Sequence, residues 1–378
     1  MKIGILNFPL RTNFGGILQS FALQTILERK GHEVEVLYQS EDNCRYPHKS
    51  YLMPLVYAKR ILHNICSKNK IAVFFEHNEK RNRPIIRQNT DRFLSKYLKH
   101  RDLLDFSDIT KSDYDAIIVG SDQVWRLEYF QSSWGANISN AFLSFTKGWD
   151  IKRIAYAASF GVDFWEYNDS DTLVCAEAAK TFDAISVRED SGVDLCRERL
   201  GVEATHVLDP TLLLSKDDYM KLVSAANTPQ SPGNMLCYIL DQTAFKTEVI
   251  NRISATQHLT PFNVNAQVDN SALPVEQRIQ PPLEAWLRGF YDAKFVVTDS
   301  FHACVFSIIF GKPFIAIGNA SRGMTRFTSL LRLFGLESRL ITESHPDLPA
   351  DYTTLPDLSS LLEKYRNASH NFLDSNLK

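Results

Sequence analysis

The sequence predicts an α/β protein made of two Rossmann-like, doubly wound domains that face a cleft. The chain opens with a strand, a loop, a helix and a second strand, and short apolar segments that each end in a polar or glycine turn follow. A polar stretch containing Pro and Gly, 225–234, separates two sets of such segments. Strands that alternate with helices favour parallel sheets. At 378 residues, the chain is also long for a single core.

The opening unit carries the clearest periodicity. A strand is expected at 2–8 (KIGILNF), followed by the loop PLRTNFGG and a helix at 17–31. Apolar residues of this helix fall on one face, and Gly31 is a typical C-terminal stop. The next strand is VEVLY, 34–38. This β-loop-α-β unit begins a parallel sheet.

The segment 59–101 differs in charge from the rest of the chain. It contains twelve Lys or Arg residues against three Asp or Glu residues, and some of its apolar residues recur at helical spacing. We expect one or two basic helices here.

The remaining segments complete two sheets. The first set of expected strands lies within 114–125, 153–161, 182–190 and 205–214, and the second set is MLCYIL, LTPFNV, AKFVVTDS and KPFIAI. The predicted domains are therefore 1–224 and 235–350, joined by the linker 225–234. An amphipathic helix within 355–378 is predicted to pack back onto the first domain.

Composition argues against several classes of protein. The net charge of −2 gives the chain no nucleic-acid-binding signature. No apolar run approaches the ~20 residues of a membrane-spanning helix, and the apolar N-terminus is too short for a signal peptide. The cysteines form no CxxC pair, which argues against a zinc site or a disulfide scaffold and fits a reducing cytoplasm. They stand at positions 44, 66, 175, 196, 237 and 304.

Polar residues at strand ends are the candidate site, because ligands of open α/β sheets bind at the carboxyl ends of the strands. In TDSFHACVF, 298–306, a strand ends in a turn with Ser300, and His302 falls in the first turn of an apolar helix. A helix N-terminus lowers the pKa of a histidine and attracts an anion. His302 is thus a candidate acid-base group beside a phosphate, and a buried structural histidine is the alternative.

Three arginines follow other strand ends. Arg188 in ISVRED could bind a phosphate or carboxylate in a bidentate manner, with a surface ion pair as the alternative. Arg322 and Arg326 are four residues apart and could present two guanidinium groups to one anion. Solvated charges at a helix start are the alternative for that pair.

Two further motifs stand at strand ends. In VGSDQVW, Asp122 beside Gln123 could position or deprotonate a hydroxyl group, or Ser121 or Asp122 could simply cap a helix. In TNFGG, residues Asn13–Gly16 could let backbone amides approach a ligand, or they could form a plain tight turn. No DxD-like metal motif stands out.

In this order, the motifs resemble the polysaccharide pyruvyl transferase family. The matching pieces are NFGGILQSFALQTIL, YDAIIVGSDQVW, AYAASFG, ISVRED, VLDPTLLL, FVVTDSFHACVFSIIF and RGMTRFTSLLRLFGL. The resemblance extends from residue 3 to about 340. Where relatives often read SFHGTVF, this chain has Ala303 and Cys304 but keeps His302. The stretch 40–110 has no matching motif.

The resemblance implies an architecture like that of the two-domain glycosyltransferases of the B type. It implies phosphoenolpyruvate as co-substrate, no bound cofactor or metal, and a sugar diol that becomes a pyruvate ketal in a bacterial capsule or exopolysaccharide. By this resemblance, His302 would contact the donor phosphate and act as general acid, and Asp122 would be the acceptor-side base or orienter. The other implied residues are Arg188, Arg322, Arg326 and Ser300 on the donor side, and Asn13, Gly15, Gly16 and Gln123 on the acceptor side.

The resemblance leaves partners and alternatives open. The acceptor could be lipid-linked or nucleotide-linked, in a cytoplasmic protein. The segment 59–101 is either a solvated surface or a peripheral contact with an anionic membrane at its inner face, in which case salt should weaken binding. The alternative functions are a nucleotide-sugar glycosyltransferase of the same architecture and a catalytically silent glycan-binding subunit.

Overall fold

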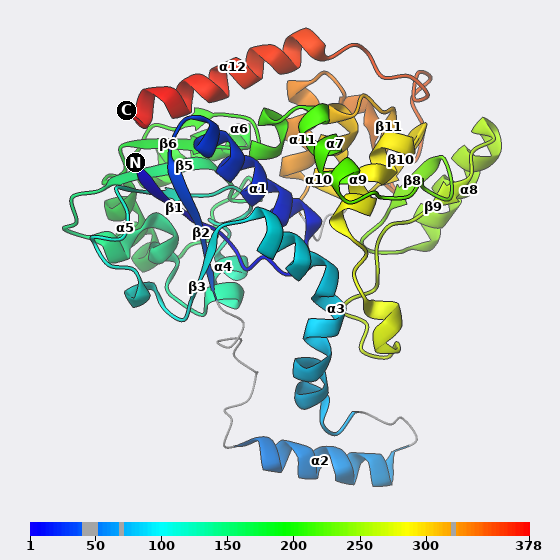
Figure 1. Ribbon diagram of the computed structural model, residues 1–378, viewed down its shortest axis with the longest axis horizontal. Helices are drawn as coiled ribbons and strands as arrows, with labels where there is room; N and C mark the ends of the chain where they lie inside the picture. The colour runs from blue at the N-terminus through cyan, green and yellow to red at the C-terminus, as the bar shows by residue number, and fades with distance from the viewer. Residues whose placement is uncertain (40–51, 68–71, 319–322) are drawn as a thin grey trace.

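The structure, a computed structural model, describes residues 1–39, 52–67, 72–318 and 323–378. It contains two β-sheets with helices packed around them, and the sheets lie in two halves of the molecule (Figure 1). Every pairing between neighbouring strands is parallel. The predicted α/β fold with two Rossmann-like domains is confirmed.

The first sheet has the strand order of a dinucleotide-binding fold. In spatial order it contains β3 (His100–Leu103), β2 (Glu33–Gln39), β1 (Lys2–Leu6), β4 (Ala116–Val119), β5 (Lys152–Ala158), β6 (Ala184–Val187) and β7 (Thr205–His206). The winding reverses between β1 and β4. All four residues of β4 are buried, as expected for a strand covered on both faces.

The second sheet is smaller and has the flavodoxin-like order. In spatial order it contains β12 (Leu340–Ile341), β11 (Phe314–Ile317), β10 (Phe295–Thr298), β8 (Met235–Tyr238) and β9 (Pro261–Phe262). Here the winding reverses between β10 and β8. Each sheet therefore has one point of reversal, where the ends of two neighbouring strands leave a crevice between the loops that follow them.

Helices connect the strands and cover the sheets. The α-helices are α1 (Phe14–Arg29), α2 (Met53–Cys66), α3 (Phe75–Tyr97), α4 (Leu127–Trp134), α5 (Asp169–Ala179), α6 (Asp190–Leu195), α7 (Lys216–Ala225), α8 (Ala244–Gln257), α9 (Leu283–Asp292), α10 (Phe301–Ile309), α11 (Thr325–Leu333) and α12 (Ser359–Asn376). The short helical turns are η3 (Phe106–Asp108), η4 (Ile138–Phe142), η5 (Ser144–Thr146), η6 (Cys196–Leu200), η7 (Pro210–Leu213), η8 (Val275–Arg278) and η10 (Glu337–Arg339).

Two predicted boundaries are wrong for identifiable reasons. Helix α1 begins at Phe14 rather than at residue 17, because the Asn13 side chain accepts a hydrogen bond from the Gly15 N–H and caps the helix there. The predicted strand within 205–214 pairs only at β7. Pro210 then begins η7, where the Asp209 side chain caps the turn through Thr211 N. Proline favours such a first position and cannot donate to a strand ladder.

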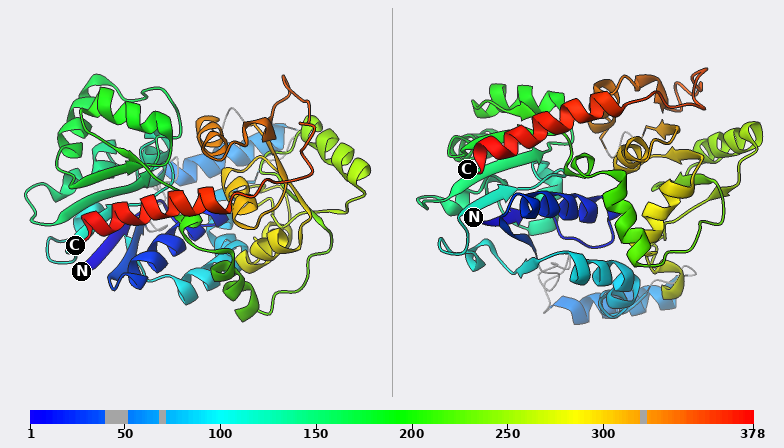
Figure 2. Two further views of the ribbon diagram at one scale, coloured as in Figure 1. Left: turned by 90° about the horizontal axis from the view of Figure 1, so that it is seen from above. Right: turned by 45° about the horizontal axis from the view of Figure 1, so that its top comes forward.

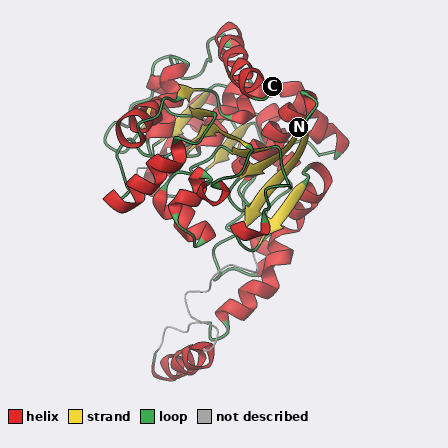
Figure 3. Ribbon diagram, turned by 90° about the vertical axis from the view of Figure 1, so that its left-hand side faces the viewer, coloured by secondary structure: helices red, strands yellow, loops and turns green. Residues whose placement is uncertain are grey.

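The basic segment forms an arm. The predicted basic helices correspond to α2 and α3, and they extend away from the two sheets (Figures 1 and 3). At its sheet-facing end, α3 meets the second domain, where Asn89 donates to the Gln280 carbonyl at 2.8 Å and the Gln280 N–H donates to the Ile86 carbonyl at 2.9 Å.

One apolar core joins the two domains. The largest cluster of buried apolar side chains runs from the first sheet through α1 into α9 and α10. Phe14, in the first turn of α1, lies 5.7 Å from Trp286 between ring centroids. The interface that frames the site is thus a packed hydrophobic contact.

The C-terminal helix α12 crosses from the second domain back over the first (Figure 2). Its Arg366 donates to the carbonyls of Leu212 and Leu214, at 2.5 and 2.8 Å, and its Ser369 hydroxyl accepts from Leu208 N at 3.0 Å. The side chain of Leu373, also in α12, is completely buried. This helix therefore supports the segment that contains Asp209.

Within the described residues, none of the helices combines the length and hydropathy that crossing a membrane requires.

Replacement of Leu373 by Ala should lower the free energy of unfolding by about 2–5 kcal/mol, because it leaves a cavity under α12. Urea unfolding measures this change. Leu173→Ala is the matched control, since Leu173 is 64% exposed and its truncation should have little effect. Equal effects of the two substitutions would show that α12 does not anchor the fold.

Candidate functional site

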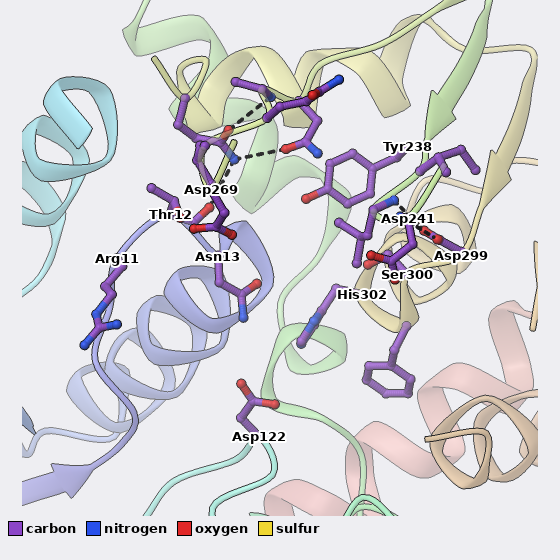
Figure 4. A pocket seen from close by; sticks show the side chains of 18 of the residues that line it. Arg11, Thr12, Asn13, Asp122, Tyr238, Asp241, Asp269, Asp299, Ser300 and His302 are labelled. Carbon is purple, nitrogen blue, oxygen red and sulfur yellow. Dashed lines mark hydrogen bonds between the residues drawn. The ribbon is translucent and has the colours of Figure 1, made fainter. Parts of the chain in front are cut away.

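A cavity of about 1090 Å³ lies where the two points of strand reversal face each other. Its lining includes Asn13, which follows β1, and Asp122, which follows β4. From the second domain it includes Asp241, which follows β8, and His302, which follows β10. Figure 4 shows Asn13, Asp122 and His302 converging on one space. This is the position at which open α/β sheets bind ligands.

His302 lies in the first turn of α10 and is only 6% exposed. Its imidazole packs directly against the backbone of Gly15, where an added Cβ would stand 2.0 Å from Nδ1. Burial lowers the pKa of His302 to about 4, although the nearby Asp209 and Asp122 carboxylates oppose the change. The ring is therefore neutral at pH 7 in the unliganded protein.

Asp209 lies beneath His302 and was not singled out from the sequence. Its Oδ2 is 3.8 Å from His302 Nε2 and accepts from Arg188 at 2.8 Å and from the Gln19 amide. Its Oδ1 accepts from the Thr211 hydroxyl and N–H. Burial alone would raise the pKa of Asp209, but the Arg188 charge together with these hydrogen bonds holds it below its ordinary value. Asp209 is thus a buried carboxylate that faces the imidazole.

Arg188 is the centre of a buried charge cluster. It is 4% exposed and pairs with Asp209 at 2.8 Å, with Glu189 at 3.3 Å and with Asp122 at 3.6 Å. The ring of Phe301 covers its guanidinium, 4.7 Å away. Burial opposes the charged form, but the three carboxylates raise the pKa of Arg188. The alternative of a surface ion pair is wrong, and the guanidinium lies behind the cavity lining.

Asp122 faces the cavity with an unusual backbone. Its φ is +79°, in the left-handed region that non-glycine residues seldom adopt. A bridge to Ala158 on the neighbouring strand holds this conformation. The next helix, α4, begins only at Leu127, so the alternative in which Ser121 or Asp122 caps a helix is wrong. Gln123 also lines the cavity, and its side chain accepts from Arg126 at 3.1 Å.

The structure describes one of the two arginines of the predicted pair. Arg326, in α11, lines the cavity and is 8% exposed, so it is not a solvated charge. Its guanidinium lies 5.5 Å from the ring of Phe301, on which Arg188 also stacks. Burial, followed by repulsion from Arg188, lowers the pKa of Arg326 to about 10. Arg322 lies outside the described residues.

The glycine motif is part of a helix and not the expected loop or a plain turn. Asn13 caps α1, and both Gly15 and Gly16 belong to its first turn. Gly15 allows His302 to approach, whereas a Cβ on Gly16 would lie 3.3 Å from the Asn13 amide and in ordinary contact with Asp122 Oδ2, at 3.8 Å. The requirement for glycine is therefore specific to Gly15.

The two polar residues that precede α10, Asp299 and Ser300, differ in their contacts. Ser300 precedes α10 and lines the cavity. Asp299 also reaches the cavity wall, but its carboxylate accepts from Leu240 N, Asp241 N and Lys246 Nζ at 2.7–3.1 Å. Asp299 thus fixes the turn after β8.

The outer wall of the cavity is rich in amide side chains that sequence reasoning did not identify. An amide offers both a donor and an acceptor, so it can bind hydroxyl groups of either orientation. Four of these residues lie in the segment after β9, and Gln280 joins them by donating to the Thr12 carbonyl at 3.1 Å. The amide residues of this wall are Gln242, Asn263, Asn265, Gln267, Asn270 and Gln280.

Among the described residues, no group of three or more His, Cys, Asp or Glu side chains is arranged to hold a metal ion.

Similarity between this chain and individual known proteins is low. No curated protein matches the chain significantly. Solved structures with some similarity include MurG from Acinetobacter baumannii, with 11% identity, a TM-score of 0.45 and coverage of 100% of this chain and 99% of that chain. They also include the UDP-GlcNAc 2-epimerase from Neisseria meningitidis, with 11% identity, a TM-score of 0.43 and full coverage of both chains.

The match to a protein family is decisive. The model of the polysaccharide pyruvyl transferase family matches residues 13–321, from the N-cap of α1 to the approach to α11. Asp122, Arg188 and His302 all fall within this range. The match covers most of the chain, and the chain belongs to the polysaccharide pyruvyl transferase family.

Proposed function

We propose that this protein transfers the pyruvyl unit of phosphoenolpyruvate to two hydroxyl groups of a sugar, with release of phosphate and formation of a pyruvate ketal. The observation that carries the proposal is the pairing of a buried neutral imidazole, His302, with a buried guanidinium, Arg326, on one cavity wall. Both groups are deprived of water and both favour an anion beside them.

The donor supplies the charge that the site needs. A phosphate bound at the start of α10 would meet the N–H groups of that helix and the Arg326 guanidinium. Its negative charge would raise the pKa of His302 and allow the ring to hold a proton. The neutral ring of the unliganded site would thus become a general acid once the donor is present.

The reaction then follows in two stages. His302 gives a proton to the methylene carbon of the donor, C2 becomes electrophilic, and one sugar hydroxyl forms a C2–O bond while Asp122 takes the hydroxyl proton. The C2–O bond to phosphate then breaks, the electron pair leaves with phosphate, and the second hydroxyl closes the ketal. The proton of the second hydroxyl passes to the His302 imidazole, and Asp122 gives the proton of the first hydroxyl to the departing phosphate, so both side chains return to their starting protonation states.

Arg188 acts in this proposal from behind the cavity lining. The expected direct clamp on the donor would require the guanidinium to leave three carboxylates and the Phe301 ring. We instead assign Arg188 to positioning Asp209 and Asp122. Arg326 and Ser300 contact the donor, with Arg322 as a further proposed contact.

The amide wall is the proposed acceptor side, together with Asn13 and Gln123. Hydroxyl-rich substrates suit such a surface. We place the product in a bacterial surface polysaccharide made in the cytoplasm, which family membership supports. The acceptor is proposed to be a lipid-linked or nucleotide-linked sugar.

Phosphoenolpyruvate should raise the melting temperature of the protein. At a concentration of 100 times Kd, the stabilisation is about 2.7 kcal/mol, or a shift of several degrees. The shift should at least halve in His302→Ala. Nucleotide sugars serve as the contrasting ligands: a shift with these alone would favour a glycosyltransferase, and no shift with either ligand would favour a glycan-binding subunit.

Gly15→Ala should lower turnover of phosphoenolpyruvate by about 100-fold, because the new Cβ displaces His302 by more than an ångström. Gly16→Ala is the matched control, one residue further along the same helix. It should stay within a few-fold of wild type, because its Cβ requires only a shift of a few tenths of an ångström in the Asn13 side chain. Comparable losses in both variants would contradict the assignment of His302, provided that circular dichroism shows both to be folded.

Donor binding at pH 7.0 should take up about half a proton, because the His302 pKa is expected to rise from about 4 to about 7 as the anion binds. Calorimetric titrations in buffers of different ionisation enthalpy measure this uptake. His302→Gln has no titratable ring and should show none. Equal uptake in this variant would assign the proton to another group or to the donor itself.

A further inference from the structure

Helix α2 presents an apolar face to solvent. None of its fourteen residues, all of which the structure describes, is buried. Leu55, Leu62 and Ile65 are 68%, 62% and 73% exposed, and Ile61 is 46% exposed. At 100° per residue these side chains share one side of the helix with Cys66. Such a face is unusual for a surface helix, whose apolar side normally packs against the core.

The opposite side of α2 is tied to the arm. Arg60 makes a bidentate ion pair with Glu76, at 2.6 and 2.7 Å, and also donates to the Val73 carbonyl. Tyr57 packs on Phe74, with 5.0 Å between ring centroids. These contacts hold the polar side of α2 against the start of α3, so the apolar side is turned outward, at the far end of the arm (Figures 1 and 3).

The charge around α2 indicates what covers this face. The three acidic residues of 59–101 are all paired with arginines, Glu76 with Arg60, Glu79 with Arg278 and Asp91 with Arg87. Residues 53–67, which include the exposed Lys59, contain no Asp or Glu. In α3, Arg81 is also exposed. The field at this end of the arm is therefore positive, which attracts an anionic surface.

The same charge disfavours a second copy of the chain. Two such helices would bring like charges together across the contact. A helix of fourteen residues is also only about 21 Å long, and one face of it falls short of the roughly 800 Å² per partner of a stable interface.

We propose that α2 is an interfacial helix that inserts its apolar face among the headgroups of an anionic lipid bilayer. An exposed apolar face with cationic flanks and no acidic residue is the pattern of helices that lie in the plane of a membrane surface. In this proposal, the apolar side chains of α2 insert into the bilayer, and this insertion strengthens membrane binding beyond the attraction due to the net charge of 59–101. Helix α3 connects α2 to Gln280 at the cavity wall. The cavity would therefore lie at a fixed distance from the lipid surface. The proposal does not depend on which reaction the cavity catalyses.

The test measures binding of the full chain to vesicles of phosphatidylcholine with and without phosphatidylglycerol, by co-sedimentation. The wild type should bind the anionic vesicles, and the triple variant Leu55→Ser, Leu62→Ser, Ile65→Ser should bind at least about ten-fold more weakly. The matched control replaces three exposed apolar residues elsewhere, Leu104, Phe164 and Leu173, by Ser and should bind like the wild type. High salt should weaken the wild-type interaction without abolishing it.

A fluorescent reporter on Cys66 separates insertion from simple attraction. Cys66 is exposed on the apolar side, and the other described cysteines are buried. With Cys44→Ser in the background, an environment-sensitive dye on Cys66 should shift its emission to shorter wavelength when anionic vesicles are added. Failure of the wild type to bind, equal binding by the triple variant, or an unshifted dye would each overturn the proposal. Concentration-dependent dimers that the triple variant abolishes, without vesicle binding, would assign the face to a second copy.

Discussion

The site depends on the ion pairs that the buried Arg188 guanidinium makes with carboxylates. A charge removed from water costs several kcal/mol unless it is well paired, and here Asp209, Glu189 and Asp122 share the pairing. These carboxylates come from the ends of different strands of the first sheet. One cation therefore gathers separate loops at one point, and loss of Arg188 would leave three carboxylates without this cation.

The same cluster connects the two domains. Phe301, at the start of α10, lies between the guanidinium groups of Arg188 and Arg326. The neighbouring residue, His302, lies against Gly15 of the first domain and faces Asp209. The His302 imidazole thus belongs to one domain, while Gly15 and Asp209 beside it belong to the other. This explains why the interface between the domains is a continuous apolar core and not a loose hinge.

The sequence predicted the parts of this arrangement that follow from topology. Asp122 and Arg188 could be placed together because the carboxyl ends of parallel strands meet at one edge of a sheet, and His302 could be added because the two domains were expected to face a cleft. Asp209 could not be, because the apolar run around it was read as a strand, whereas Pro210 turns the chain and directs the carboxylate inward. Gln19 was hidden on the buried face of a helix, where an amide has no periodic signature. The depth of Arg188 also depends on three partners that are distant in sequence, and no local pattern encodes such burial.

Burial sets the electrostatic properties of His302 and Arg326 in the cavity wall. Burial lowers the pKa of His302 to about 4 and that of Arg326 to about 10, so both cationic forms are disfavoured in the empty cavity. Each pKa unit corresponds to about 1.4 kcal/mol, and an anion that relieves both groups gains from both. A ligand with a single charge can neutralise only one of them well. The proposed donor carries a phosphate and a carboxylate on the same carbon, so its two anionic groups could approach both side chains at once. In the proposed function, selectivity for such a donor would come from the free energy by which burial disfavours the protonated His302 ring and the charged Arg326 guanidinium.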